Sequence, residues 1–330
     1  MVVMNEILPI VLCGGSGTRL WPVSRRDFAK QHAPILGGLS PFQRTLERLA
    51  GDDAISAPLV IAGAGGRFMA AEQASAVGAR TTMLLEPEAR DTAAAIAAGL
   101  AHASRKRPDA VVAILPSDHL IRDAGSFRAA LRRAAVGAAA GDIVAIGVRP
   151  TEPATGYGYI RPGASLASGA RRVEQFVEKP DADCAGALIA EGCLWNAGMF
   201  CMRADVGLAE LRRLAPEIEA AAVAAVDEAT EDLGALVLGS AFSAAPKTSF
   251  DYAVMERTDR AAVIEADFDW SDIGDWREIW RLSPKDAAGN AVEGRVTTLD
   301  ARDNYLRADG RLVCALGVEG LAVIDTPDAV

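Results

Sequence analysis

The chain has 330 residues, of which 50% are hydrophobic and 24% charged, and this length allows a globular protein with a sizeable buried core. Its formal net charge of -10 excludes general binding to nucleic acid or to an anionic membrane surface, because the summed field repels both. No apolar stretch approaches the roughly 18 to 20 residues of a spanning helix, and the N-terminus lacks a basic leader, so we expect a cytoplasmic protein.

Short apolar runs alternate with alanine-rich segments in the first half of the chain. The apolar runs have the length of buried strands and occupy residues 7–15, 58–63, 81–87, 110–118 and 142–148. Residues 92–106 and 126–141 are rich in alanine, leucine and arginine, which favours helix. This alternation predicts an α/β fold with a Rossmann-like, doubly wound mixed sheet, in which ligands bind at the carboxyl ends of the strands.

The second half of the chain has a different pattern. Residues 157–180 indicate strands of an antiparallel or mixed insertion, and a long helix is expected around residues 205–230. From about residue 296, short strand-like pieces alternate with Asp, Asn and Gly turns, which predicts a small β-helix-like appendage. We therefore divide the chain into a catalytic domain, 1–285, and a small C-terminal β domain, 286–330, which we expect to be incomplete.

Five cysteines are scattered without a C-x-x-C pair, which favours reduced and mostly buried thiols over a disulfide framework or a zinc site.

A glycine-rich loop follows the first predicted strand. Such a loop lets backbone N–H groups point at an anion, and it consists of Gly14, Gly15, Ser16, Gly17 and Thr18. Arg19 and Lys30 supply the cations that would neutralise a polyphosphate. The loop is not a Walker A motif, which needs Lys before Ser or Thr, and Leu20 stands where a dinucleotide fingerprint has its third glycine. By itself the loop is equally consistent with a turn between strand and helix.

The segment "GGSGTRLWPVSR" followed by "AKQ" resembles the signature of sugar-nucleotide pyrophosphorylases, and "RLWP" is similar to their bacterial mannose-1-phosphate guanylyltransferase branch. Seven further segments match in family order: "EPEARDTAAAI", "LPSDHLI", "TGYGYI", "FVEKP", "WNAGMF", "SFDYAVME" and "WSDIGDW". Two positions depart from the family. Ala29 replaces a proline before the loop lysine, and Asp91 replaces an asparagine after the arginine of "EPEAR".

The resemblance implies transfer of GMP from GTP to mannose 1-phosphate with Mg²⁺, releasing pyrophosphate, and we expect a homodimer. The chemistry is in-line attack of a phosphate oxygen on the α-phosphorus, so cations and metal carry the catalysis. Another hexose 1-phosphate, dTTP or UTP remains an alternative, as does a regulatory homologue without turnover. Larger relatives carry an isomerase domain that this chain is too short to hold, so isomerase activity is not expected.

The resemblance places the catalytic cations, the base contacts and the metal at separate motifs. Arg19 and Lys30 would bind the leaving pyrophosphate. The residues expected to contact the nucleotide base are Glu86, Arg90 and Thr92. Asp118 and Asp272 would hold Mg²⁺ through their carboxylates, unless they serve as helix N-caps. His119 lacks a second ligand at metal spacing, which favours a structural hydrogen bond.

The sugar phosphate is assigned to three segments in the middle of the chain. Glu178 would accept from sugar hydroxyls and Lys179 would pair with the phosphate, although a surface ion pair before a turn proline is the alternative. The other residues expected on the sugar side are Gly156, Tyr157, Gly158, Asn196 and Gly198. The glycines would allow close approach of the sugar, and Asn196 offers a donor and an acceptor to a hydroxyl.

Overall fold

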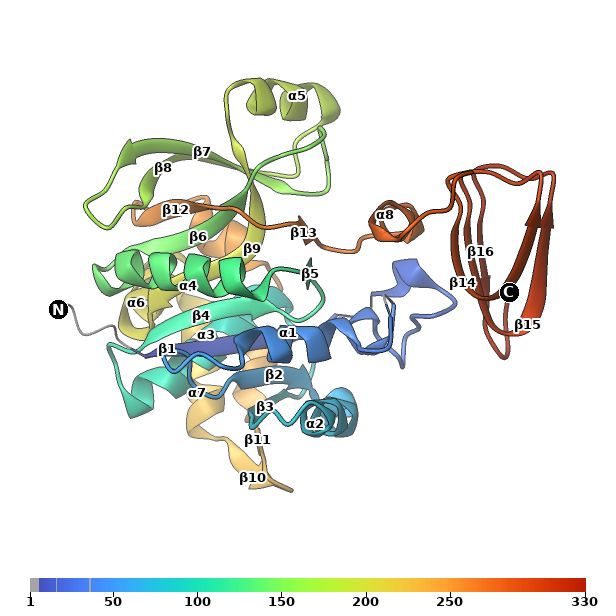
Figure 1. The fold of residues 1–330 in the computed structure, drawn as a ribbon. Helices are drawn as coiled ribbons and strands as arrows, with labels where there is room; N and C mark the ends of the chain where they lie inside the picture. Colours follow the sequence, from blue (N-terminus) through green and yellow to red (C-terminus); the bar gives the residue numbers. More distant parts are fainter. Residues whose placement is uncertain (1–5, 16, 36) are drawn as a thin grey trace. The chain divides into compact units, whose positions relative to one another are not determined.

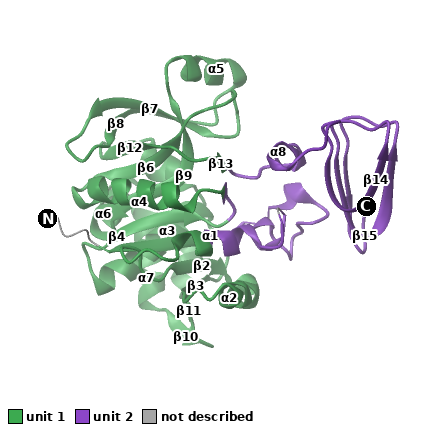
Figure 2. Ribbon diagram, in the orientation of Figure 1, with its two compact units in different colours: residues 1–14, 46–117, 121–270 green, residues 15–45, 118–120, 271–330 purple. Residues whose placement is uncertain are grey.

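The computed structural model describes residues 6–15, 17–35 and 37–330. The chain divides into two compact units, each assembled from several segments (Figure 2). Unit 1 consists of residues 1–14, 46–117 and 121–270. Unit 2 consists of residues 15–45, 118–120 and 271–330. The predicted division into two consecutive domains, 1–285 and 286–330, is a different kind of division from these units and stays a prediction.

The main sheet belongs to unit 1 and has eleven strands in the order β10-β11-β3-β2-β1-β4-β9-β6-β12-β8-β7 (Figure 1). Its strands are β1 Ile7–Cys13, β2 Leu59–Gly63, β3 Thr82–Glu86, β4 Val111–Pro116, β6 Ile143–Val148, β7 Gly158–Ser165, β8 Arg171–Glu178, β9 Leu194–Arg203, β10 Thr230–Asp232, β11 Ala235–Val237 and β12 Ala261–Ala266. β1, β2, β3 and β4 pair in parallel, and β9 is antiparallel to β4 and β6. The predicted mixed α/β sheet is confirmed, as is the antiparallel β7–β8 insertion.

Helices cover the sheet on both faces. The α-helices are α1 Pro41–Leu49, α2 Arg67–Ala76, α3 Asp91–Lys106, α4 Ala124–Ala139, α5 Ala182–Ala190, α6 Ala204–Leu214, α7 Pro216–Asp227 and α8 Trp276–Leu282. α3, α6 and α7 pack together on one face, and α4 packs on the other against β4, β6, β9 and β12 (Figure 1). The alanines of α3 lie close to the strands, since a Cβ on Gly99 would already be 3.0 Å from Ile10 and Ile61.

The single long helix expected around residues 205–230 is wrong. The segment forms α6 and α7, separated at Ala215, and Pro216 occupies the first turn of α7. A proline fits there because its missing N–H has no helical partner in a first turn. The composition favours helix throughout, but the proline sets the break.

The C-terminal segment forms a separate parallel sheet in unit 2, as expected for a β-helix-like appendage. Its strands are β14 Ala291–Leu299, β15 Tyr305–Leu316 and β16 Ala322–Asp325. Side chains of β14, β15 and β16 join a core with α8 and with the segment after the glycine loop, through Tyr305, Ile279 and Leu20 among others. The two-residue strands β5 Leu120–Ile121 and β13 Trp270–Ser271 pair with each other.

Within the described part of the chain, no helix is long and apolar enough to cross a membrane. The cysteines are free thiols; Cys13, Cys193 and Cys201 are buried, as expected for most of them, and Cys184 and Cys314 are exposed.

Candidate active site

The glycine loop begins where β1 ends and continues into unit 2. Gly15 and Gly17 have φ angles of 91° and 52°, in the left-handed region that glycine adopts without strain. A Cβ on Gly17 would lie only 2.4 Å from the Cβ of Lys30, so this glycine is required by close packing as well as by conformation. A space beside Gly14 stays open, with nothing within 4 Å of a Cβ built there. Ser16 lies outside the described residues.

Thr18 and Arg19 open the short 3₁₀ helix η1, Thr18–Leu20, and both are exposed. Among the residues that the structure describes, Arg19 has no ion pair or hydrogen bond. A Cβ built on Gly274 would lie 3.3 Å from Asp272 Oδ1 and 3.6 Å from the Arg19 guanidinium, so both side chains border the same space. The loop cation and the Asp272 carboxylate are therefore neighbours within unit 2.

Lys30 begins the 3₁₀ helix η2, Lys30–His32, and is only 5% exposed. Its Nζ lies 2.7 Å from Asp118 Oδ2 and donates to the backbone carbonyls of Asp272, at 2.5 Å, and Ile273, at 3.4 Å. All three ammonium donors therefore have acceptors. The structure thus links Lys30 to the carboxylate of Asp118 and to the backbone of Asp272, a connection that the sequence did not reveal.

Asp118 and Asp272 have the chemistry of a Mg²⁺ site. Burial raises the pKa of Asp118, but the charges of Lys30 and His119 and the hydrogen bonds to the carboxylate together outweigh this, and the pKa lies below its ordinary value. The carboxylate is thus ionised, as a hard cation requires, and Lys30 ties it to the backbone of Asp272. Phosphate oxygens and water would have to complete the coordination, because the described residues contain no cluster of three protein ligands.

The structure also bears on the alternative roles of Asp272 and His119. Asp272 is not a helix cap, since Asp275 caps α8 by accepting from the N–H of Glu278 at 2.9 Å. His119 Nε2 lies 3.8 Å from Asp118 Oδ1, which is longer than a hydrogen bond. The imidazole therefore lies beside the Asp118 carboxylate without a hydrogen bond between the two atoms.

Glu86, the last residue of β3 in unit 1, is a buried carboxyl group with an unused oxygen. It is 7% exposed, and its Oε1 has no hydrogen-bond partner among the described residues. Burial raises the pKa of Glu86 from 4.5 to about 7. An unpartnered buried polar atom is costly, and it is expected where a ligand supplies the missing donor.

Arg90 and Thr92 follow Glu86 at the start of α3. The Arg90 guanidinium contacts Glu88 Oε1 at 2.9 Å, while its Nε is buried without a partner among the described residues. The Thr92 hydroxyl accepts a hydrogen bond from the Phe250 N–H at 2.9 Å. Thr92 thus anchors the segment that precedes Asp251 by accepting a hydrogen bond at its hydroxyl oxygen.

The predicted sugar residues form one cluster in unit 1. Lys179 Nζ lies 3.2 Å from Glu178 Oε1 at the end of β8, and Lys179 has a φ of 48°. Gly158 pairs with Glu178 in the β7–β8 register. A Cβ on Gly158 would lie 2.5 Å from Glu178 Oε2 and 3.4 Å from the Cβ of Asn196, so the glycine leaves room for both side chains.

Asn196 of β9 is 8% exposed and fixed at both ends of its amide. Its Nδ2 donates to Asp251 Oδ1 at 2.7 Å, and its Oδ1 accepts from the Gly198 N–H at 3.1 Å. Gly198 has a φ of 65°, which glycine adopts without strain. Gly198 therefore shapes the strand around Asn196.

Tyr157 belongs to an aromatic group of three. Its ring centroid lies 5.0 Å from those of Trp195 and Trp270, in edge-to-face contact with each. Gly156, just before it, is exposed with nothing within 4 Å of a Cβ. The aromatic group gives this end of the sheet a rigid apolar wall.

Asp251 also belongs to the cluster of predicted sugar residues, and the sequence does not single it out, although its segment "SFDYAVME" carries part of the family resemblance. Burial and the charge of Glu178 raise its pKa to about 6. The only local signal was an aspartate before an apolar run, which is common. Its place beside Asn196 depends on tertiary structure.

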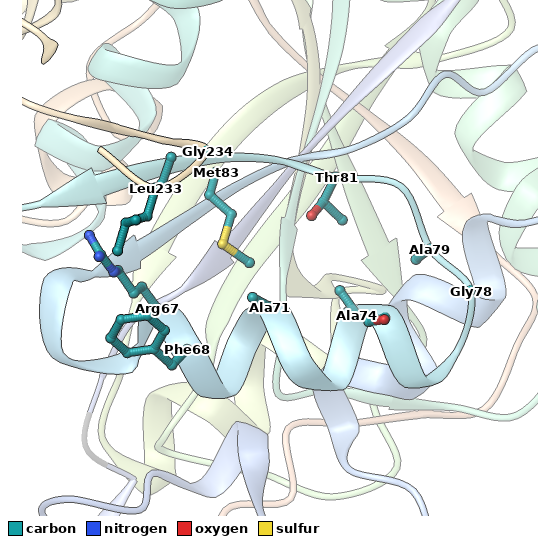
Figure 3. Close-up of a pocket in the computed structure, with 12 residues that line it drawn as sticks. Arg67, Phe68, Ala71, Ala74, Gly78, Ala79, Thr81, Met83, Leu233 and Gly234 are labelled. Atoms are coloured by element: carbon teal, nitrogen blue, oxygen red, sulfur yellow. The ribbon is translucent and has the colours of Figure 1, made fainter. Parts of the chain in front are cut away.

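Two cavities lie away from these clusters. One, of about 410 Å³, lies between α2 and the β10–β11 hairpin, with Arg67, Phe68, Met83 and Leu233 among its lining residues (Figure 3). The other, of about 660 Å³, lies among turns of the C-terminal sheet in unit 2. Neither contains a predicted site residue.

Comparison with protein families gives two matches that follow each other along the chain. Residues 8–289 match the family described as Nucleotidyl transferase, which is most of the chain. Residues 294–330 match the family described as MannoseP isomerase/GMP-like beta-helix domain. The second match agrees with the parallel strands β14, β15 and β16.

Relatives and solved structures agree with this result. The chain is 44% identical to the xanthan biosynthesis protein XanB of Xanthomonas campestris pv. campestris (strain B100), over 99% of this chain and 70% of that protein. It is 40% identical to a mannose-1-phosphate guanylyltransferase of Escherichia coli, over 98% of this chain and 70% of that protein. A Thermus thermophilus structure described as mannose-1-phosphate geranyltransferase has a TM-score of 0.88 at 35% identity, covering 98% of this chain and 93% of its own. The chain therefore belongs to the nucleotidyl transferase family and carries a β-helix segment of the mannose-phosphate isomerase/GMP type.

Proposed function

We propose that this protein is a mannose-1-phosphate guanylyltransferase, which forms GDP-mannose and pyrophosphate from GTP and mannose 1-phosphate. The Escherichia coli relative of that name, 40% identical over 98% of this chain, supports the reaction. The unpartnered carboxyl oxygen of Glu86 supports the choice of base and is the observation on which the proposal for GTP rests.

Guanine offers two adjacent donors, N1–H and the N2 amino group, which match the two oxygens of one carboxylate. Thymine and uracil offer a single N–H flanked by carbonyl oxygens, and those oxygens would face a carboxylate unfavourably. The ionised form of Glu86 therefore favours guanine. Discrimination of this kind is strong when a site is built to bind a donor that the competitor lacks.

The reaction needs no covalent enzyme intermediate. A phosphate oxygen of mannose 1-phosphate attacks the α-phosphorus of GTP, and the bond from that phosphorus to the oxygen bridging the α- and β-phosphates breaks as pyrophosphate leaves. The glycine loop with Arg19 would bind the triphosphate. The exposed Arg19 guanidinium is suited to the charge that grows on the leaving group.

Mg²⁺, when bound by Asp118 and Asp272, would neutralise phosphate oxygens and favour the leaving group. Lys30 supports those two residues through its ion pair to Asp118 and its bond to the Asp272 carbonyl. A phosphate oxygen that replaces one of these acceptors would bind the same ammonium. Lys30 would thus stabilise the phosphate charge directly or by positioning Asp118.

The sugar phosphate is assigned to the cluster of Glu178, Lys179 and Asn196. The Lys179 side chain is 58% exposed and can reach a phosphate, whereas that of Glu178 is 10% exposed and faces Gly158. A carboxylate accepts from sugar hydroxyls, and an ammonium pairs with phosphate. The predicted homodimer remains part of this proposal.

The test is product identification. The purified chain, mixed with GTP, mannose 1-phosphate and Mg²⁺, should yield pyrophosphate and a product with the mass of GDP-mannose in equal amounts. EDTA should stop both. Pyrophosphate without the sugar nucleotide would indicate hydrolysis of GTP and refute the transfer reaction.

A further inference from the structure

Asp251 has no assigned role, yet it contacts a residue of the sugar cluster. Its Oδ1 accepts the Asn196 amide at 2.7 Å, and this pair lies beside Glu178 and Lys179, whose charges act on Asp251. The side chain is half-buried. Glu178, Asp251, Asn196 and Lys179 together therefore provide two carboxylates, one amide and one ammonium.

The orientation of the Asn196 amide is determined by its two neighbours. Turning the amide over would place its NH₂ group against the Gly198 N–H and its oxygen against the Asp251 carboxylate, and both contacts would be repulsive. Among the described residues, the second Asn196 N–H and the Asp251 carboxylate have no other side-chain hydrogen-bond partner, so both can serve a ligand. The pair thus presents a donor and an acceptor next to each other.

The backbone holds Asp251 in place. It is the first residue of the short π-helix η5, Asp251–Met255, a rare conformation that is frequent at functional sites. The preceding N–H, of Phe250, donates to the Thr92 hydroxyl, and the Ala93 N–H donates to the Thr248 carbonyl at 3.2 Å. The start of α3 therefore fixes the position of the carboxylate.

We propose that Asp251 and Asn196 bind one and the same hydroxyl group of the hexose, which makes Asp251 a specificity-determining residue. A hydroxyl is at once a donor and an acceptor, so it matches the pair. The Asn196 N–H donates a hydrogen bond to the hydroxyl oxygen, and Asp251 accepts a hydrogen bond from the hydroxyl O–H. This inference rests on the proposed function. A hydrogen bond from the ligand to Asp251 also offsets the repulsion between the charges of Glu178 and Asp251.

The experiment measures binding by calorimetry, independently of turnover. Mannose 1-phosphate is compared with four analogues that each lack one hydroxyl, at carbon 2, 3, 4 or 6. Asp251→Ala and Asn196→Ala should each weaken mannose 1-phosphate binding about 10-fold or more. Both should abolish the penalty for the same single missing hydroxyl and keep the penalties for the other three.

Two further variants make the result specific. Asp251→Asn retains an acceptor oxygen and should recover part of the discrimination that Asp251→Ala loses. Glu256→Gln alters an exposed carboxylate at the end of the same segment and should bind like the wild type. Thermal unfolding midpoints of all variants confirm that they fold.

The outcomes separate this inference from the proposed function. The inference alone is overturned if Asp251→Ala keeps the wild-type binding penalty for every missing hydroxyl. It is also overturned if Asp251→Ala and Asn196→Ala lose the penalties for different hydroxyls. Wild-type protein that binds hexose 1-phosphates but makes no GDP-mannose overturns only the proposed reaction. Wild-type protein that binds no hexose 1-phosphate overturns both.

Discussion

The ammonium of Lys30 lies 2.7 Å from the carboxylate of Asp118, and only 5% of the lysine is exposed. The same ammonium donates to the carbonyl of Asp272, 242 residues further along the chain. One buried cation thus joins the Asp118 carboxylate to the backbone of Asp272, the two residues proposed for the metal. In the proposed mechanism, the phosphate chemistry would depend on how accurately this lysine is held.

Gly17→Ala should lower kcat about 100-fold, because even a displacement of about 1 Å at a catalytic group costs that much. The added Cβ would lie 2.4 Å from the Lys30 Cβ, so the lysine must move. Steady-state kinetics at saturating substrates provide the measurement.

Gly38→Ala is the matched control for Gly17→Ala. Gly38 has a φ of 74°, so its substitution carries comparable backbone strain, but nothing lies within 4 Å of its Cβ. It should keep near wild-type kcat. Equal losses in the two variants would mean that strain, and not the position of Lys30, causes the defect.

Asp118→Asn and Asp272→Asn should each reduce Mg²⁺-dependent turnover by about 10² to 10³ while the fold persists. The amide removes a charge and scarcely changes volume. Turnover is titrated with Mg²⁺, and circular dichroism monitors folding. Near wild-type activity of Asp272→Asn at saturating Mg²⁺ would remove that residue from the metal site.

Glu86→Gln should reduce selection for guanine. The wild type should prefer GTP to ITP, which lacks the N2 amino group, at least about 10-fold in kcat/KM. The variant should lose most of this preference. A glutamine amide has one acceptor oxygen, whereas the carboxylate has two, so the variant can accept from only one of the two guanine donors. An unchanged GTP-to-ITP ratio would place the base elsewhere.

The pH dependence of the same residue gives an independent readout. Its pKa in the folded protein is about 7, above the ordinary 4.5, so Glu86 must lose a proton before it binds guanine as an anion. kcat/KM for GTP should rise with pH up to about 7 more steeply in the wild type than in Glu86→Gln. Titration of GTP itself is common to both proteins.

The free energy of unfolding should fall as pH rises, whereas kcat/KM for GTP should increase. Between pH 4.5 and about 7 the unfolded chain loses the Glu86 proton while the folded chain keeps it, so the free energy of unfolding falls as pH rises. The fall is at most about 3 kcal/mol. Glu86→Gln should lack this component in urea unfolding measured across that range.

Lys179→Ala and Lys30→Ala should fail differently. Loss of Lys179 should raise KM for mannose 1-phosphate about 10- to 100-fold with little change in kcat, as loss of a charged contact common to ground and transition states does. Loss of Lys30 should mainly lower kcat. Equal kinetic defects, with KM for mannose 1-phosphate unchanged, would contradict the division of roles.

Much of the fold was predictable from the sequence because buried parallel strands and alanine-rich helices have distinct local patterns. The apolar runs at residues 58–63 and 142–148 contain β2 and β6. Local pattern fails where a single residue decides, as Pro216 does when it separates α6 from α7. Propensity predicts the helical content there, and the proline determines the break.

The candidate site was predictable in residue type but not in contacts. Motif resemblance named Lys30 and Asp118 without showing that they form an ion pair. The unused oxygen of Glu86 and the bond from Asn196 to Asp251 arise from tertiary packing. Local sequence does not determine such tertiary contacts, so the sequence did not identify Asp251 as a candidate site residue.

The most direct test of the account is pyrophosphate release with GTP, ITP, dTTP and UTP, each combined with the 1-phosphates of mannose, glucose and galactose. The account predicts the highest kcat/KM for GTP with mannose 1-phosphate. A 10-fold preference for dTTP or UTP, or for another hexose 1-phosphate, would contradict it.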